Sequence, residues 1–156
     1  MAKGEGAVFG KLVHRLFEKT DWCQPGLVEK MAEIEGKDLG ASGLMIKRPG
    51  KMVKEALSSS LLQIVIKSGN YQKEVPFTYK NDGTIFEGVM DVVSREGDGL
   101  VVLDFKTDLV KKDDLSSKIE HYRPQAQVYS DAIKTIFGQP PKEVVFFFLL
   151  SCATYT

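Results

Sequence analysis

Apolar side chains recur at helical spacing over the first 70 residues. Between Ala7 and Lys19 they are three and four positions apart, which predicts an amphipathic helix with a wide buried face. A second helix is expected from Leu27 to Ile34, with Pro25 near its start. A third is expected over about Lys51 to Ile66, although the serines at 58–60 weaken helix propensity in its middle.

The pattern changes to strand-like segments after a turn signal at residues 68–70. Tyr71–Tyr79, Thr84–Arg95 and Leu100–Phe105 read as three consecutive strands that are separated by glycine-containing turns. Pro76 places the first of them at an edge of the sheet or makes it irregular, because proline cannot donate to a strand ladder. The three segments predict a meander.

The last third of the chain predicts one more helix and one more strand. The polar stretch Asp108–Lys118 is expected to be a solvated loop. A helix should then run to about Phe137, with Pro124 in its first turn, where a missing N–H is harmless. Val144–Leu150 is a run of seven apolar residues, typical of a strand that is covered on both faces and parallel to a neighbour.

The order of these elements is helices, a three-strand meander, a helix and a strand. It predicts an α/β fold with a small mixed sheet flanked by helices. The 156 residues are enough for one domain, with an N-terminal helical part at 6–70 and a core of sheet and helix at 71–150.

Composition and charge exclude several classes of protein. Hydrophobic residues make up 43% and charged residues 27%, as in ordinary globular proteins rather than disordered ones. With 21 basic and 21 acidic residues the net charge is zero, which disfavours a polyanion partner unless a local patch supplies the charge. Two cysteines cannot form a disulfide framework or a four-thiolate metal site. The longest apolar run is too short for a bilayer, and no secretory signal is evident, so we expect no membrane partner and a cytoplasmic location.

Charged residues converge on two of the predicted strands. If Gly97-Asp98 is a two-residue hairpin loop, opposite residues have numbers that sum to 195, and Asp91 faces Asp104. Lys106 lies two residues beyond Asp104 and shares its face, because side chains alternate along a strand. A register shift by one residue would separate the two aspartates.

Two carboxylates that face each other across neighbouring strands repel each other, and burying them unpaired costs free energy. A divalent cation would resolve the conflict, since Mg²⁺ is held by one or two carboxylates, waters and substrate phosphate oxygens. Lys106 could then orient a water or stabilise charge that develops on a phosphoryl group. The competing interpretation is a solvated strand end at which Lys106 forms an ordinary salt bridge, and spacing alone does not separate the two.

Five segments in fixed order add the context that spacing lacks. They are Gly10-Lys-Leu-Val-His14, Glu74-Val-Pro-Phe77, Glu87-Gly-Val-Met-Asp91, Val102-Leu-Asp-Phe-Lys-Thr107 and His121-Tyr-Arg-Pro-Gln-Ala-Gln-Val-Tyr129. Together they resemble the RecB-type nuclease domain of the PD-(D/E)XK, or restriction-endonuclease-like, superfamily. The likeness is greatest to the C-terminal nuclease domain of AddA- or RecB-like helicase–nucleases, and it spans roughly residues 6 to 150.

The resemblance implies a role for each matching residue. Asp91, Asp104, the backbone carbonyl of Phe105 and His14 would hold the metal, and Lys106 would be the catalytic lysine. Gln125 and Tyr129 would line the site from one face of a helix, since they are four residues apart. From the residues alone, a packing role on an apolar helix face is the more common one for His14 and Tyr129.

The function that the resemblance implies is a Mg²⁺-dependent deoxyribonuclease, an exonuclease of DNA end processing and recombinational repair. Mn²⁺ would serve as a substitute, and DNA and a helicase domain or subunit outside this chain would be the partners. Some relatives carry an iron–sulfur cluster on four cysteines, which two cysteines cannot supply. The alternatives are a catalytically silent DNA-binding or scaffolding module of a repair complex and an unrelated metal-independent α/β domain.

Overall fold

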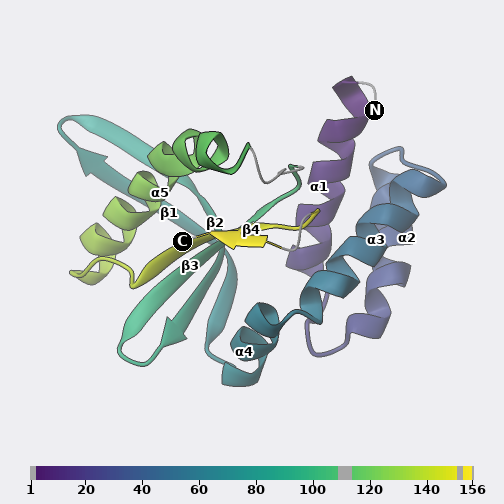
Figure 1. Cartoon of the computed structure of the whole chain (residues 1–156), viewed down its shortest axis with the longest axis horizontal. Helices are drawn as coiled ribbons and strands as arrows, with labels where there is room; N and C mark the ends of the chain where they lie inside the picture. Colours follow the sequence, from purple (N-terminus) through teal and green to yellow (C-terminus); the bar gives the residue numbers. More distant parts are fainter. Residues whose placement is uncertain (1–2, 109–113, 151–152, 156) are drawn as a thin grey trace. The chain divides into compact units, whose positions relative to one another are not determined.

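The computed structural model describes residues 3–108, 114–150 and 153–155. The chain divides into two compact units, Met1–Gly69 and Asn70–Thr156 (Figure 1). In the described ranges, no helix combines the length and the apolar character needed to cross a bilayer.

The first unit consists of helices. It contains α1 (Lys3–Lys19), the 3₁₀ turn η1 (Pro25–Leu27), α2 (Val28–Asp38), α3 (Leu44–Leu57) and α4 (Ser60–Ser68). Its buried side chains come from the helical stripes that the sequence pattern predicts, with Leu12, Leu16, Val28, Val53 and Leu57 almost inaccessible to solvent.

The single helix predicted for residues 51–66 is wrong. Two helices occupy this part of the chain, because Ser59 leaves the helical conformation and its side chain accepts a hydrogen bond from the backbone N–H of Leu62 at 3.4 Å. A serine in this position caps the start of a new helix. The helix before it, α3, also begins seven residues earlier than predicted, at Leu44.

The second unit is a five-stranded sheet with one long helix. The strands β1 (Tyr71–Asn81), β2 (Thr84–Glu96), β3 (Gly99–Lys106), β4 (Glu143–Phe148) and β5 (Ala153–Tyr155) lie in the sheet in that order. Neighbours are antiparallel except for β3 and β4, which are parallel. The mixed α/β fold and the parallel pairing of the strand after α5 with a neighbour are therefore as predicted, and β1 is an edge strand, as Pro76 indicated.

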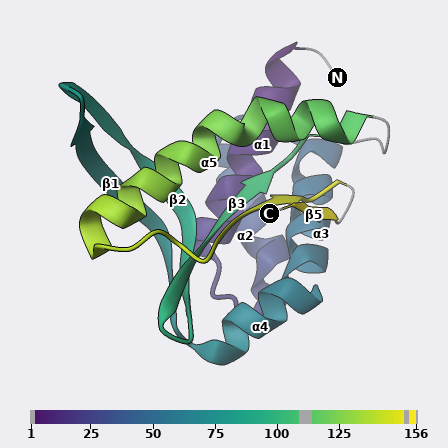
Figure 2. The ribbon, with the colours of Figure 1, turned by 60° about the vertical axis from the view of Figure 1, so that its left-hand side comes forward.

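Helix α5 (Leu115–Phe137) lies along one face of this sheet (Figure 2). Its Tyr129, Ala132 and Ile133 pack with side chains of β1, β2 and β3 in one apolar cluster. The predicted start of this helix is wrong, because Pro124 lies in its interior and not in its first turn. Residues 115–118, which were predicted as the end of a loop, thus form the first turn of the helix.

The last strand also differs from the prediction. It ends at Phe148 rather than Leu150, and the chain continues to β5, a strand that the sequence pattern did not indicate. Three residues are too few to show a period of two, so the signal for β5 is weak by nature.

The hairpin between β2 and β3 has the predicted register. Its pairs run from Glu96↔Gly99 to Val92↔Leu103, and each pair sums to 195. Gly97 takes a φ of +62°, the left-handed conformation that favours glycine in such a loop. The ladder stops one pair short of Asp91 and Asp104, which therefore lie where the two strands separate.

Candidate active site

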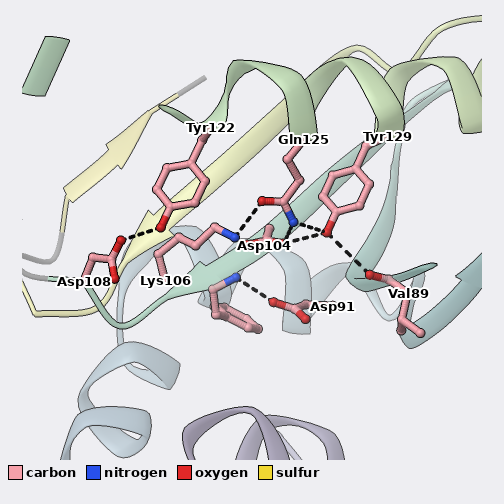
Figure 3. A network of polar contacts seen from close by, with 9 residues as sticks. Val89, Asp91, Asp104, Lys106, Asp108, Tyr122, Gln125 and Tyr129 are labelled. Carbon is pink, nitrogen blue, oxygen red and sulfur yellow. Dashed lines mark hydrogen bonds and ion pairs between the residues drawn. The ribbon is translucent and has the colours of Figure 1, made fainter. Parts of the chain in front are cut away.

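The C-terminal end of β3 carries an aspartate and a lysine on the face that α5 covers (Figure 3). Asp104 is 3% exposed, and Lys106 Nζ lies 2.6 Å from its Oδ2. This contact is an ion pair, and Oδ2 has no further hydrogen-bond partner among the described residues. Oδ2 is therefore a buried carboxylate oxygen with acceptor capacity to spare.

Helix α5 supplies a glutamine and a tyrosine that complete the network. Lys106 Nζ donates to Gln125 Oε1 at 2.8 Å, and Gln125 Nε2 donates to Asp104 Oδ1 at 3.0 Å and to the hydroxyl of Tyr129 at 2.7 Å. The Tyr129 hydroxyl donates to the same Oδ1 at 2.7 Å. The two helix residues thus fix both Asp104 and Lys106, since their i, i+4 spacing puts them on one face.

A second carboxylate is held by the backbone of β3. Asp91 Oδ2 accepts a hydrogen bond from the N–H of Phe105 at 2.7 Å. On the other side of Asp91, the pairing of β2 with β1 is interrupted at Glu74, which has a φ of +49°. Asp91 therefore lies at a local irregularity of the sheet, where its side chain bonds to the backbone of the neighbouring strand β3.

The surroundings of Asp104 disfavour its charge. Burial raises the pKa of this carboxyl above its ordinary value, and the nearby charge of Asp91 raises it further. Lys106 and the Tyr129 hydroxyl act in the opposite direction without cancelling the rise. The pKa of Tyr129 is also raised, first by burial and then by the charge of Asp104, so this hydroxyl stays a hydrogen-bond donor.

Aromatic rings surround the ammonium of Lys106 on its other side. Its Nζ lies 4.5 Å from the centre of the Tyr122 ring and 5.4 Å from that of Phe146 on β4. The Tyr122 hydroxyl donates to Asp108 Oδ2, which also accepts from Lys118 Nζ at 3.1 Å. Burial would raise the pKa of Asp108, but these two hydrogen bonds and the charges of Lys118 and Lys106 together outweigh it and leave the pKa below its ordinary value.

Comparisons with known proteins agree with this geometry. The profile of a family described as the PD-(D/E)XK nuclease superfamily matches residues 2–154. The chain belongs to the PD-(D/E)XK nuclease superfamily. The restriction-endonuclease-like core that the resemblance implied is therefore confirmed.

Individual relatives of this PD-(D/E)XK chain are named as subunits of an ATP-dependent helicase/nuclease. One from Thermoanaerobacter sp. strain X514 is 34% identical over 159 residues, which cover 86% of this chain and 12% of the relative. One from Carboxydothermus hydrogenoformans is 24% identical over 163 residues, covering 93% of this chain and 14% of the relative. The chain thus spans about an eighth of the length of these relatives.

The PD-(D/E)XK core brings together most of the residues that the sequence predicted. Asp91, Asp104, Lys106, Gln125 and Tyr129 form one connected group in the second unit. Phe105 lies between Asp104 and Lys106, and its backbone N–H anchors Asp91. His14 belongs to α1 of the first unit, where it is half-buried, and its role as a metal ligand stays a prediction.

The chemistry of the two aspartates fits a hard divalent cation. Both offer carboxylate oxygens, and Asp104 Oδ2 is buried without a hydrogen bond from the described residues. No group of three or more His, Cys, Asp or Glu side chains in the described ranges could hold a metal. Two carboxylates nevertheless suit Mg²⁺, which keeps several waters and substrate oxygens in its coordination shell.

Some contacts of this PD-(D/E)XK site were not foreseen from the sequence. Asp108 belongs to the predicted solvated loop, and the carbonyl of Val89, 3.4 Å from the Tyr129 hydroxyl, is not among the predicted site groups. For Phe146 the sequence predicts only a place in a buried strand. Asp108 could have been suspected from its position two residues after Lys106, whereas a backbone carbonyl leaves no signal in side-chain patterns.

A glycine in the predicted motif shapes the wall behind Tyr129. A Cβ on Gly88 would lie 2.8 Å from Phe77 Cζ, and the buried Phe77 ring packs edge-on against the Tyr129 ring at 5.9 Å. The ring cannot retreat without moving Tyr129. We expect Gly88→Ala to lower the free energy of unfolding by about 1–3 kcal/mol, the usual cost of overpacking a core.

Urea unfolding followed by circular dichroism measures this change. Gly26→Ala is the matched control, because a Cβ there meets no atom within 4 Å and its backbone is not in the left-handed region. A Gly88→Ala variant as stable as this control would show that Phe77 and Tyr129 have room to shift.

Proposed function

We propose that this chain is a divalent-metal-dependent deoxyribonuclease that degrades DNA from its ends. The observation that carries the proposal is a network of polar contacts in which Gln125 and Tyr129 fix Asp104 and Lys106. Asp91 is hydrogen-bonded to the backbone beside them. A surface salt bridge would need no such support from a second element. Membership of a nuclease superfamily points to the same chemistry.

Asp91 and Asp104 would hold Mg²⁺, or Mn²⁺ in its place, together with the carbonyl of Phe105 and the imidazole of His14. When bound, the cation would supply positive charge to the phosphate and a more acidic bound water. The raised pKa of Asp104 agrees with a cation site, since an added positive charge would favour the ionised carboxylate that metal binding requires.

The protein's own residues would act on a phosphodiester that enters beside α5. Lys106 would orient the attacking water and stabilise negative charge that grows on the phosphoryl oxygens. As the water oxygen gives up a proton to solvent and bonds to phosphorus in line, the bond to the leaving ester oxygen would break, and that oxygen would take up a proton from solvent. Gln125 would hold Lys106 in place, because it accepts a hydrogen bond from the ammonium.

A hollow next to these groups would admit the substrate. Gln125 and Tyr129 line an open hollow of about 380 Å³, together with side chains of β1 and β2 and with Pro124 and Val128 of α5. A DNA strand lying in it would pass within reach of the network of Figure 3.

The biological setting that we propose is DNA end processing in recombinational repair. Relatives named as helicase/nuclease subunits are about eight times as long as the matched segment. A helicase domain or partner subunit would therefore deliver the DNA to this nuclease.

The test is cleavage of end-labelled linear DNA, single- and double-stranded, beside a covalently closed circle of the same sequence. We expect cutting of the linear DNA in Mg²⁺ or Mn²⁺, none in EDTA, and survival of the circle. Cutting of the circle would replace the exonuclease by an endonuclease. Metal binding and DNA binding without cutting would favour a silent DNA-binding module.

A further inference from the structure

A second hollow, which the proposed nuclease mechanism leaves unused, lies between α5 and β4. It measures about 250 Å³. Its apolar surface comes from Phe146 and Phe148 on the strand and from Tyr122, Ala126 and Ile119 on the helix. Ile119 is 42% exposed, a large apolar side chain left at the border of the hollow.

The hollow adjoins the candidate active site directly. Tyr122 and Phe146, two of its lining residues, are the rings over which Lys106 Nζ lies at 4.5 and 5.4 Å. These two rings pack against each other at 5.3 Å, and the hydroxyl of Tyr122 is fixed by Asp108. A ligand in the hollow would therefore contact the same ring that contacts the proposed catalytic lysine.

Basic side chains border the aromatic surface. Lys118 and Arg123 both line the hollow, and they lie five residues apart on α5. Each has an acidic partner, since Lys118 contacts Asp108 at 3.1 Å and Arg123 contacts Glu120 at 2.6 Å. The pair of Arg123 and Glu120 is mostly exposed, so it contributes little to stability, and Arg123 can exchange Glu120 for a phosphate.

We propose that this hollow binds an unpaired base of single-stranded DNA next to the phosphate that is cut. Aromatic rings flanked by cationic side chains are how proteins bind single strands without sequence preference, since every base has a face that can stack. Bases in a duplex are stacked and paired and cannot enter such a hollow without being pulled out. The inference rests on the proposed nuclease function, and it adds a base-binding subsite beside the same site.

The test is the affinity of fluorescent oligo(dT) by anisotropy in EDTA, where nothing is cut. Each protein variant is measured with oligo(dT) and with a strand of equal length whose central positions lack bases. We expect the wild type to bind the abasic strand about tenfold more weakly, the loss that follows from one or two stacked bases.

Ile119→Glu should weaken oligo(dT) binding about tenfold and abasic-strand binding less than threefold, because it puts a charge where the base stacks. Ile136→Glu is the matched control: Ile136 is 50% exposed on the same helix, does not line the hollow, and undergoes the same change of charge. It should change neither affinity by more than twofold.

Equal affinity of the wild type for oligo(dT) and the abasic strand would overturn the proposal. Equal losses of oligo(dT) affinity in Ile119→Glu and Ile136→Glu would also overturn it, because the added negative charge alone would then explain both losses. If Ile119→Glu lowers thermal stability without changing the affinity ratio, the hollow packs protein and not DNA. Base-dependent binding without any cleavage would support base binding in the hollow and contradict the nuclease function. Cleavage without base-dependent binding would support the nuclease function and contradict base binding in the hollow.

Discussion

Lys106→Met is expected to reduce cleavage of linear DNA by a factor of about 10²–10³ in kcat, with little change in KM. Removal of one preorganised donor to transition-state charge typically has an effect of this size. The methionine keeps an unbranched apolar side chain beside the Tyr122 and Phe146 rings, so the packing around the site is retained. Single-turnover cleavage with protein in excess measures the chemical step.

Lys142→Met controls for the loss of a paired lysine. Lys142 contacts Glu96 at 3.3 Å, and its backbone N–H donates to the carbonyl of Leu100 near the start of β3, six residues before Lys106. The Lys142→Met variant should cleave DNA like the wild type. A Lys106→Met variant that keeps more than a tenth of the wild-type rate, with fold and metal binding unchanged, would contradict a catalytic role for this lysine.

Arginine should not replace this lysine. Its guanidinium is planar and presents a fork of donors, whereas the ammonium of Lys106 fits between Asp104, Gln125 and the Tyr122 ring. We therefore expect Lys106→Arg to keep the charge and still lose most of the cleavage rate. The comparison separates the position of the charge from its mere presence.

The pairing of β2 with β3 was predictable because its causes are local. A two-residue turn at Gly97-Asp98 sets the register, and alternation of side chains then places Asp104 and Lys106 on one face. Asp91 was expected opposite Asp104 in a regular ladder, whereas the ladder ends one pair earlier and the Asp91 side chain bonds to the Phe105 N–H. Turn rules fix a register but do not say where two strands part.

The misplaced start of α5 has a different origin, because it depends on packing. Pro124 usually marks the start of a helix, yet α5 begins nine residues earlier at Leu115. The added turns allow Tyr122 to pack against Phe146 and Phe148, a gain that a single-sequence pattern cannot weigh.

Asp104→Asn is expected to abolish cleavage and to stabilise the metal-free protein at the same time. The asparagine keeps Oδ1, the acceptor for Gln125 and Tyr129, and removes the buried charge next to Asp91. An amide nitrogen near Lys106 Nζ offsets part of the gain. The raised pKa of Asp104 gives the net direction, since it means that the surroundings as a whole, lysine included, favour the uncharged side chain.

The gain should depend on pH with a definite sign. Because the pKa of Asp104 is higher in the folded than in the unfolded chain, the folded state binds more protons between the two values. Ionisation of Asp104 therefore lowers the free energy of unfolding of the wild type as the pH rises through the folded pKa. The Asn variant lacks this loss, so its advantage should grow with pH and then level off.

Thermal unfolding in EDTA over a pH series, and again with Mn²⁺, measures both effects. Saturating metal at about 100 times its Kd should stabilise the wild type by about 2.7 kcal/mol and leave Asp104→Asn unchanged. Asp98→Asn, the same change on the exposed hairpin loop, should behave like the wild type throughout. If the metal stabilised all three proteins equally, Asp104 would not hold it.

A less stable Asn variant in EDTA at high pH would mean that the ion pair with Lys106 outweighs the cost of burying the charge of Asp104. An inactive Asp104→Asn variant that is more stable than the active wild type would show the opposite. The wild type would then retain a destabilising carboxylate because its chemistry requires one.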